Sequence, residues 1–522
     1  MKRTKSTLSV ALCLLVSTLI FGSAAVFTSC GNNTLEEILG AVDNPAPKAA
    51  TISFASASKA WGTLDGNFIL EVTNTGDGAV SYSSADPAIA TINPTTGEVT
   101  PLAAGTTTIT ATVSNSDNSV YESHTAQYTL TVGTGYHYLE WNTTTKVFDV
   151  KYTTGTPLEG TVANTAITNG TYIIKGNVTI TGDVTLSDDV ELILSDGSKL
   201  NITGQVNGYT NSKSLTIYAQ SEGSDMGQMN VEKEDANAIN LKGLTIHGGK
   251  INAKATSTTS LGDGIWSNGD VYIYGGEVKA QGCDRTSGGQ GGRGMSLYSG
   301  STYYTVYILN HARVELIGGN STGNKGGNGI WGNVVISGDA EFKATGGDCS
   351  GNNSEGGRGI DGKVTASGHA KVTVNGGNGT DNDVEGGMGT AGFTTVKDYA
   401  QLIATGGNGH GSKKGGTAIS TLDIHDNAYV EATGGNGGSS GNGGNAINYD
   451  FDYYGGKFIA LAGTKGSSGT SDGKAMNNFI NYTTPNAVSI EYTTDGTTWT
   501  GLNVTGTSNN TEVQNRGVRK LD

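Results

Sequence analysis

Residues 326–348, GGNGIWGNVVISGDAEFKATGGD, decide how the larger part of this chain folds. Between two Gly-Gly pairs, apolar and polar residues alternate with a period of two, which indicates strands with one buried face. A flexible glycine-rich linker would not keep this alternation. The stretch therefore predicts short β-strands, and the rest of the sequence tells whether they form a repeat.

The pattern recurs at nearly constant intervals. In the quoted stretch, the residues expected to face inward are Ile330, Val334, Ile336, Ala340, Phe342 and Ala344. So few small side chains cannot form a core alone, but stacked copies would bury one another in a continuous column. The repeat is marked by a small residue followed by an apolar one, at Ala238-Ile239, Gly264-Ile265, Gly294-Met295, Gly329-Ile330, Gly359-Ile360, Gly389-Thr390, Ala418-Ile419, Ala446-Ile447 and Ala475-Met476.

These spacings predict an all-β fold in which residues 134–476 form a right-handed parallel β-helix, a β-solenoid with about 28–30 residues per coil. The recurring Gly-Gly pairs mark one corner, where glycine is expected to supply positive φ and close backbone approach. Residues 477–522, with the hairpin signal Asp495-Gly496, are expected to cap the last coil. A second array of β-sandwiches is the alternative, but Greek-key spacing is missing.

Residues 50–133 have a different pattern. Short alternating segments at 79–84, 89–92, 98–100, 107–113 and 127–132 are separated by turn signals, as in a β-sandwich. The run 82-YSSADPAIATINPTTGEVTPLAAGTTTITATV-113 resembles bacterial Ig-like domains of group 2. That resemblance implies a spacer or adhesive module and not a catalyst.

The N-terminus is typical of an export signal. Lys2, Arg3 and Lys5 precede an apolar run that ends in 26-VFTSCG-31. This ending resembles the lipobox of bacterial lipoproteins, which implies a signal peptide at 1–29 and a diacylated Cys30, followed by a linker at 30–49. The expected location is the bacterial cell envelope, surface-exposed and attached to a membrane only through lipid. A soluble protein cleaved near Ala24–Ala25 is the alternative.

The charge of the chain limits its possible partners, and the spacing of its cysteines indicates whether they form a disulfide. The formal net charge is −15 and only 15% of residues are charged, so the basic stripe that a nucleic acid requires is missing. Cys283 and Cys349 fall two repeats apart, about 9.6 Å at ~4.8 Å per strand. Because bridged cysteines keep their Cα atoms within about 7 Å, both are expected to be free.

Residues 171–202, 215–223, 244–255 and 264–282 resemble a bacterial family of secreted β-helix proteins. Some of its members are described as carbohydrate-binding and are related to polysaccharide lyases without the lyase residues. The resemblance implies carbohydrate binding but transfers no binding residue. Lyases of this fold use clustered carboxylates and a basic proton acceptor. Here Glu277, Glu341 and Asp423 are assigned to different columns, so no enzyme is predicted.

Two candidate sites remain. Trp266 and Trp331 each follow a Gly-Ile pair, two repeats apart with Ser296 between them, and with Tyr272 and Tyr274 they are candidates for carbohydrate binding. The alternative is that these rings pack under a neighbouring loop. The run 376-GGNGTDNDV-384 resembles a calcium-binding nonapeptide, so Asp381 and Asp383 are candidate Ca²⁺ ligands. A solvated turn is the alternative there, and no other cofactor is expected.

The expected function is that of a non-catalytic cell-surface lipoprotein that displays a β-helix to bind polysaccharide or another glycan. The alternative is a surface adhesin or structural protein that contacts a host or neighbouring-cell protein. A polysaccharide lyase is the third hypothesis.

Overall fold

The computed structural model describes residues 51–114, 123–286, 288–483, 487–504, 507–508 and 513–521. The predicted signal peptide at 1–29, Cys30 and the linker at 30–49 lie outside these residues. The chain divides into two compact units. The first contains the described residues up to Lys59 together with Gly66–Val132, and the second contains Ala60–Asp65 and the chain from Gly133 onwards.

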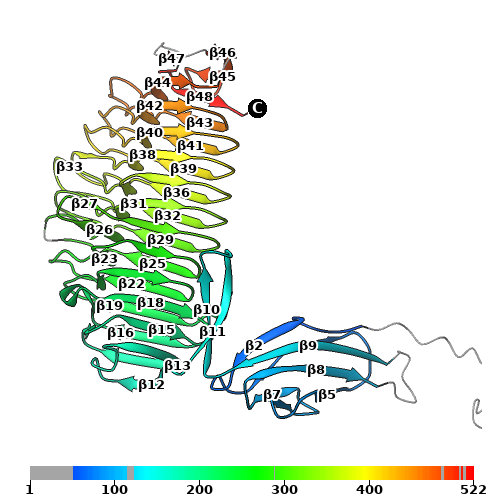
Figure 1. The fold of residues 1–522 in the computed structure, drawn as a ribbon. Coiled ribbons are helices and arrows are strands. Elements are labelled where there is room, and N and C mark those ends of the chain that lie inside the picture. Colours follow the sequence, from blue (N-terminus) through cyan, green and yellow to red (C-terminus); the bar gives the residue numbers. More distant parts are fainter. Residues whose placement is uncertain are drawn as a thin grey trace, which may run out of the picture. The chain divides into compact units, whose positions relative to one another are not determined.

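The first unit is built from short antiparallel strands (Figure 1). In β8 and β9, alternate residues such as Ile109 and Leu130 are fully buried, as the period-two pattern requires. The predicted segments at 79–84, 89–92, 98–100, 107–113 and 127–132 are confirmed as strands. One sheet has the order β2 (Ser58–Gly62), β9 (His124–Gly133), β8 (Gly105–Val113), β5 (Val80–Ser84), and the other the order β3 (Phe68–Ile69), β7 (Glu98–Pro101), β6 (Ala90–Ile92).

The second unit contains one sheet of 35 strands, from β12 (Thr156–Val162) to β48 (Gly517–Lys520). Its strands pair in parallel with the strand one repeat later. For example, β29 (Arg313–Ile317) pairs with β32 (Glu341–Thr345), which pairs with β36 (Lys371–Asn375). Figure 1 shows these turns of chain lying on one another. We call each turn, from one small–apolar pair to the next, a rung.

The small–apolar pairs form one vertical file, as predicted. Ile330 is directly opposite Ile360, Ile360 is opposite Thr390, and Thr390 is opposite Ile419. All four are fully buried, and Ile330, Ile360 and Ile419 belong to one hydrophobic cluster that runs from Leu158 to Val518. The rungs therefore bury one another's side chains in the way that the repeat predicts.

The Gly-Gly corners differ from the prediction in their cause. None of the predicted corner glycines, such as Gly346 and Gly347, has φ in the left-handed region. Glycine is required here only because the main chains of neighbouring rungs approach each other closely. A Cβ added to Gly347 would lie 2.0 Å from the carbonyl oxygen of Gly319. The Gly347 N–H donates to the Gly327 carbonyl (2.8 Å), and the Gly357 N–H donates to the Gly347 carbonyl (2.8 Å). Each Gly-Gly pair is followed by a variable loop. The segment that enters this loop, such as Gly347, is thus hydrogen-bonded through its main chain both to the segment that leaves the same loop and to the one that leaves the loop of the preceding rung.

A ladder of Asn and Asp side chains runs beside these glycines, and the sequence analysis missed it. The side-chain oxygen after each Gly-Gly pair accepts the backbone N–H of the equivalent residue in the next rung. Asn320 accepts from Asp348 (2.9 Å), Asp348 from Asn378 (2.7 Å), and Asn378 from Asn408 (2.9 Å). The signal was present in the sequence, because Asn or Asp follows each of the pairs Gly318-Gly319, Gly346-Gly347, Gly376-Gly377, Gly406-Gly407 and Gly434-Gly435.

Both ends of the second unit hold antiparallel elements. The repeat was predicted to begin at residue 134. The stacked strands begin later, because β10 (Tyr136–Asn142) and β11 (Val147–Thr153) first form a separate antiparallel hairpin. At the other end, the predicted hairpin is confirmed as β45 (Val488–Thr493) with β46 (Thr500–Val504), and β48 pairs antiparallel with β43 (Lys457–Leu461). Strand β48 thus continues the sheet beyond the last coil.

The cysteines and the possibility of a membrane span were also considered in the sequence. Cys283 and Cys349 are free and buried, as predicted. The two cysteines do not, however, occupy equivalent positions in their repeats. Cys349 pairs with Ser321 of the neighbouring rung, whereas the Cys283 carbonyl lies against Gly319, two residues before Ser321. Within the described residues, no helix has the length and apolarity that a membrane crossing needs.

Candidate functional site

Trp331 is enclosed by its own neighbourhood. Its ring stacks on Tyr298 at 4.4 Å and 15°, and the Arg293 guanidinium lies 4.2 Å from the ring centroid. Two such groups cannot share one face, so both faces of the indole are covered. The indole N–H also donates to the Tyr303 hydroxyl at 3.0 Å. Trp331 therefore matches the packing alternative and offers no open face for a sugar.

Trp266 is less enclosed. It pairs with Ser296, which in turn pairs with Trp331, so the predicted column exists. Trp266 is half-buried, with the edge of Tyr209 at 4.7 Å. Close by in register, the side-chain carbonyl oxygens of Asn240 and Asn268 are buried and accept no hydrogen bond from the described residues. Because these two oxygens are buried, the partly exposed Trp266 ring is the group that a ligand can reach here.

Tyr272 and Tyr274 do not extend that surface. Tyr274 lies under β10, with Trp141 at 6.3 Å and His247 at 5.1 Å. Burial lowers the pKa of His247 to about 4. Its neutral ring therefore accepts a hydrogen bond at Nδ1 from the backbone N–H of Trp141, at 2.8 Å. Tyr272 stacks on Tyr307 at 4.8 Å and 5°. The structure thus does not bring the four aromatic candidates onto one open platform.

The candidate calcium ligands are occupied by the backbone. Asp383 accepts the Ser412 N–H at 2.7 Å, and this hydrogen bond lowers the pKa of its carboxyl. Asp381 accepts the N–H of its own neighbour Asn382 at 2.7 Å. No group of three or more metal-ligating side chains occurs in the described ranges. The geometry favours the solvated turn for these two residues.

A groove that was not predicted from the sequence runs over the outer face of six successive strands, β19 (Gln228–Lys233), β22 (Lys250–Ala255), β25 (Glu277–Gln281), β29, β32 and β36. Its volume is about 570 Å³. We call it the charged groove, because eight of its lining side chains are ionisable, five basic and three acidic: Lys250, Glu277, Lys279, Arg313, Glu315, Glu341, Lys343 and Lys371.

The charges in the groove form two ion triads, each with one acid between two bases from the rungs on either side. Glu315 contacts Lys279 at 2.8 Å and Lys343 at 3.0 Å, and these lysines, Lys279 first, hold the pKa of its carboxyl below the usual range. Glu341 lies 3.5 Å from Arg313 and 3.6 Å from Lys371. Each triad therefore carries one positive charge in excess.

The register also corrects the assignment of acids to columns. Glu277 is opposite Arg313, and Arg313 is opposite Glu341, so the two glutamates share one column. The prediction that they lie in different columns was wrong for this pair, because the 35-residue repeat between Gly294 and Gly329 obscures the alignment.

A pair of carboxylates was missed altogether. Asp423 on β40 (Ile419–Ile424) is opposite Asp452 on β42 (Ile447–Tyr453). Each has one carboxyl oxygen that is buried and has no partner in the described residues. Burial, with the charge of Asp452, raises the pKa of Asp423 to about 6. The register shift in β42 hid this pairing from sequence spacing.

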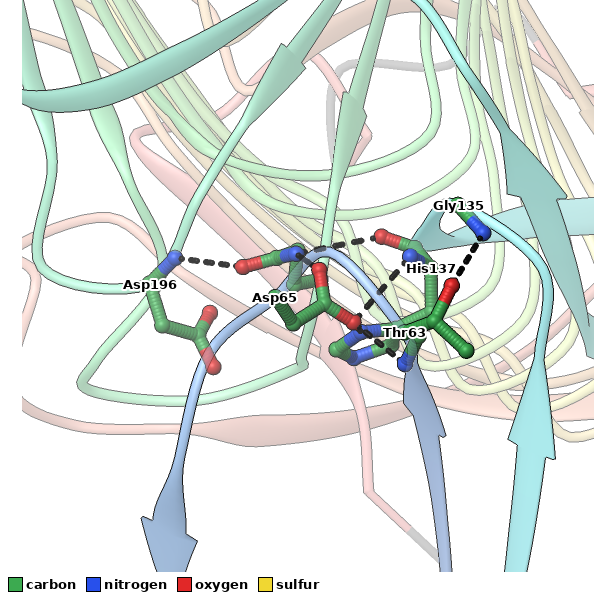
Figure 2. A network of polar contacts seen from close by, with 7 residues as sticks. Thr63, Asp65, Gly135, His137 and Asp196 are labelled. Atoms are coloured by element: carbon green, nitrogen blue, oxygen red, sulfur yellow. Dashed lines mark hydrogen bonds and ion pairs between the residues drawn. The ribbon is translucent and has the colours of Figure 1, made fainter. Parts of the chain in front are cut away.

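A buried polar network around Asp65 serves the structure of the second unit. Figure 2 shows Asp65 facing His137, whose ring nitrogen Nδ1 lies 2.5 Å from the Asp65 carboxylate. The Gln220 amide donates to Asp65 at 2.6 Å, and its own oxygen accepts the Asp196 N–H at 3.2 Å. The Asp65 side chain is 1% exposed. Because its polar contacts are internal, the network holds 60–65 against the first coils and leaves no opening for a ligand.

Comparison with known families identifies one part of the chain. Residues 59–122 match the family model of the bacterial Ig-like domain, group 2. The chain contains a bacterial Ig-like domain. The Ig-like resemblance of residues 82–113 is thereby confirmed. None of the curated proteins compared with the chain matches it.

Proposed function

We propose that this chain is a non-catalytic bacterial cell-surface protein whose second unit is a right-handed parallel β-helix of about 28–30 residues per coil and binds polysaccharide. The observation that carries the proposal is the charged groove. Its volume of about 570 Å³ lies in the range of ligand-binding sites. It is open along the direction in which the rungs stack, as an extended polymer requires.

The groove suits a glycan because its walls are polar and its floor is rigid. The lysine side chains supply three donors each, and the glutamates supply acceptors for hydroxyl groups. Every strand beneath them is hydrogen-bonded to a strand on both sides. Such a scaffold fixes the spacing of the binding groups, so that little order has to be gained on binding.

Trp266 supports the same function at a second position. Its partly open ring provides a stacking face for one sugar. Within this proposal, Trp331, Tyr274 and Asp383 have structural roles and bind no ligand.

The cellular setting follows from the sequence. In this proposal lipid on Cys30 anchors the protein in the cell envelope, and the Ig-like domain is a spacer. The substitution Cys30→Ser should move the protein from the membrane fraction to the soluble fraction while leaving its fold unchanged. Wild-type protein that is already soluble in the producing bacterium would contradict the anchor.

Binding is tested on a polysaccharide array with the wild-type protein, the double variant Lys279→Ala/Lys343→Ala and the variant Trp266→Ala. The double variant should lose most of the signal and Trp266→Ala a smaller part. Lys457→Ala, an exposed lysine on β43 outside the groove, is the matched control and should bind normally. If the wild type binds no glycan on the array, the proposal fails.

A protein-binding adhesin is the second candidate, and one observation favours it. Large aromatic side chains are exposed on the C-terminal rungs, with Tyr399 at 56%, Tyr449 at 61% and Tyr482 at 46%. Aromatic residues are enriched at protein interfaces. Cell adhesion that free polysaccharides do not compete away, together with a silent array, would favour this candidate. Unsaturated products released from acidic polysaccharides would instead indicate a lyase.

A further inference from the structure

The bases of the charged groove alternate between its two sides. Lys279 and Lys343 lie on one side, two rungs apart, and both contact Glu315 of the rung between them. Arg313 and Lys371 lie on the other side, again two rungs apart, with Glu341 between them. Each of the rungs β25, β29, β32 and β36 therefore carries one base, on alternate sides of the groove.

The balance of charge favours an anionic ligand. Each glutamate is already shared by two bases, whereas each lysine uses one of its three donors on the glutamate and keeps the others for a ligand. The groove as a whole has five bases and three acids, in a chain whose formal net charge is −15. It is thus a local positive strip on an acidic protein, which attracts acidic polymers.

The spacing narrows the choice among acidic polymers. Rungs recur about every 4.8 Å, so bases on one side recur about every 9.6 Å. An extended polysaccharide that advances by roughly one sugar per rung would meet a base on its left edge at one sugar and on its right edge at the next. A flat twofold ribbon presents equivalent substituents in this alternation, because successive sugars are turned by half a revolution.

We propose that the charged groove selects an acidic polysaccharide in twofold ribbon form, with one carboxylate per sugar on alternate edges, lying along the stacking direction. This inference rests on the proposed polysaccharide binding and specifies the ligand of the same site. Across the groove from Lys279, Arg313 and Lys343, a glutamate of the same strand meets the uncharged edge of the sugar and accepts its hydroxyl groups. A polymer with all of its carboxylates on one edge meets an acid at every second rung and is disfavoured.

Two polymers with the same linkage test the charge requirement. β-1,4-Glucuronan and cello-oligosaccharides share their backbone and differ in the carboxylate at C6. Isothermal titration with the full-length protein should give at least tenfold tighter binding for glucuronan fragments than for cello-oligosaccharides of equal length. Raising the ionic strength from low to high salt should weaken the glucuronan interaction only.

Two variants test the arrangement with opposite expected signs. Lys279→Ala/Lys343→Ala removes one side of the groove and should weaken glucuronan binding at least tenfold, while the control Lys457→Ala should leave it unchanged. Glu315→Gln keeps the length of the side chain and removes one acid from the groove, so glucuronan should bind several-fold more tightly. The melting temperature of each variant reports whether its fold is retained.

The outcomes separate this inference from the broader proposal. If cello-oligosaccharides bind as tightly as glucuronan, or if Glu315→Gln weakens binding, the selection for an acidic ribbon is overturned while polysaccharide binding stands. Hyaluronan, which carries its carboxylate on every second sugar, should bind less tightly than glucuronan, and the reverse order would also overturn the inference. If none of the three polymers binds and the array is silent, the proposed function itself fails.

Discussion

The two sides of the stacked unit hold successive rungs together in different ways. On the loop side, glycines such as Gly327, Gly347 and Gly357 bond main chain to main chain, with no room for a side chain. On the outer face of β25–β36, the strands are also hydrogen-bonded main chain to main chain, but their side chains have room and add partly exposed ion pairs such as Lys279–Glu315. The glycine contacts leave no space for a side chain, whereas exposed ion pairs contribute little to stability. Side chains are thus excluded on the loop side, whereas those of the charged face are free for function.

The largest effect is expected on the loop side. Gly347→Ala would place a methyl group 2.0 Å from the Gly319 carbonyl, and the backbone shift it forces should cost about 3 kcal/mol of unfolding free energy. Gly501→Ala is the matched control, because nothing lies within 4 Å of its added Cβ. Denaturant unfolding measures both. Equal stability of the two variants would contradict the main-chain account.

The Asp423–Asp452 pair should make stability depend on pH in the opposite sense to an ion pair. The pKa of Asp423 is raised from 3.8 to about 6, so the folded state favours the neutral carboxyl. Its contribution is fully present below pH 4 and is lost as the pH rises to about 6. Discounted for solvent screening, the loss is on the order of 1.5 kcal/mol.

Asp423→Asn should remove this part of the pH dependence and raise the melting temperature at pH 7.5. Melting curves between pH 4 and pH 8 measure it, with Asp284→Asn as a control, since Asp284 is exposed and accepts a hydrogen bond from the Asn320 N–H. An unchanged pH profile in Asp423→Asn would show that the pair does not titrate as described.

The Asn ladder should contribute less than the glycines. Asn408→Ala removes the acceptor for the Asn436 N–H and should cost about 1 kcal/mol. Asn408→Asp keeps a side-chain oxygen at the same place, as Asp348 does two rungs earlier, and should retain most of the stability. If both variants lose equally, the ladder bond is not the cause.

The smallest effect on stability is expected on the charged face. Glu341→Gln weakens the contacts to Arg313 and Lys371 and should change the unfolding free energy by less than about 1 kcal/mol. High salt should reduce even this difference. A loss as large as that of Gly347→Ala would reverse the comparison between the two sides.

The sequence predicted what depends on local periodicity. The alternation around Ile330 and its recurrence at Ile360 and Ile419 gave the strands and the file of buried residues, and Asp495-Gly496 gave the terminal hairpin. The period of two predicts which side chains face inward. A constant repeat length predicts which of these side chains lie opposite one another in neighbouring rungs.

The sequence did not predict those features of the site that depend on contacts between residues of different rungs. Trp331 was a candidate for carbohydrate binding with packing as the alternative, and Tyr298 and Arg293, more than 30 residues earlier in the chain, cover it. The triads around Glu315 and Glu341 follow from register across repeats of unequal length, and one extra residue in β42 determines the meeting of Asp423 with Asp452. Counting residues within one rung cannot supply such pairings.

Everything proposed for the charged groove depends on adjacent rungs meeting in the described register. Val335 and Thr365 are directly opposite on neighbouring strands, where Cα atoms about 4.8 Å apart suit a disulfide. The double variant Val335→Cys/Thr365→Cys should therefore form a bond under mild oxidation. Val335→Cys/Thr395→Cys, two rungs apart, should not. Mass spectrometry of the oxidised proteins decides, and a bond in the second variant but not in the first would contradict the stacking on which the groove is built.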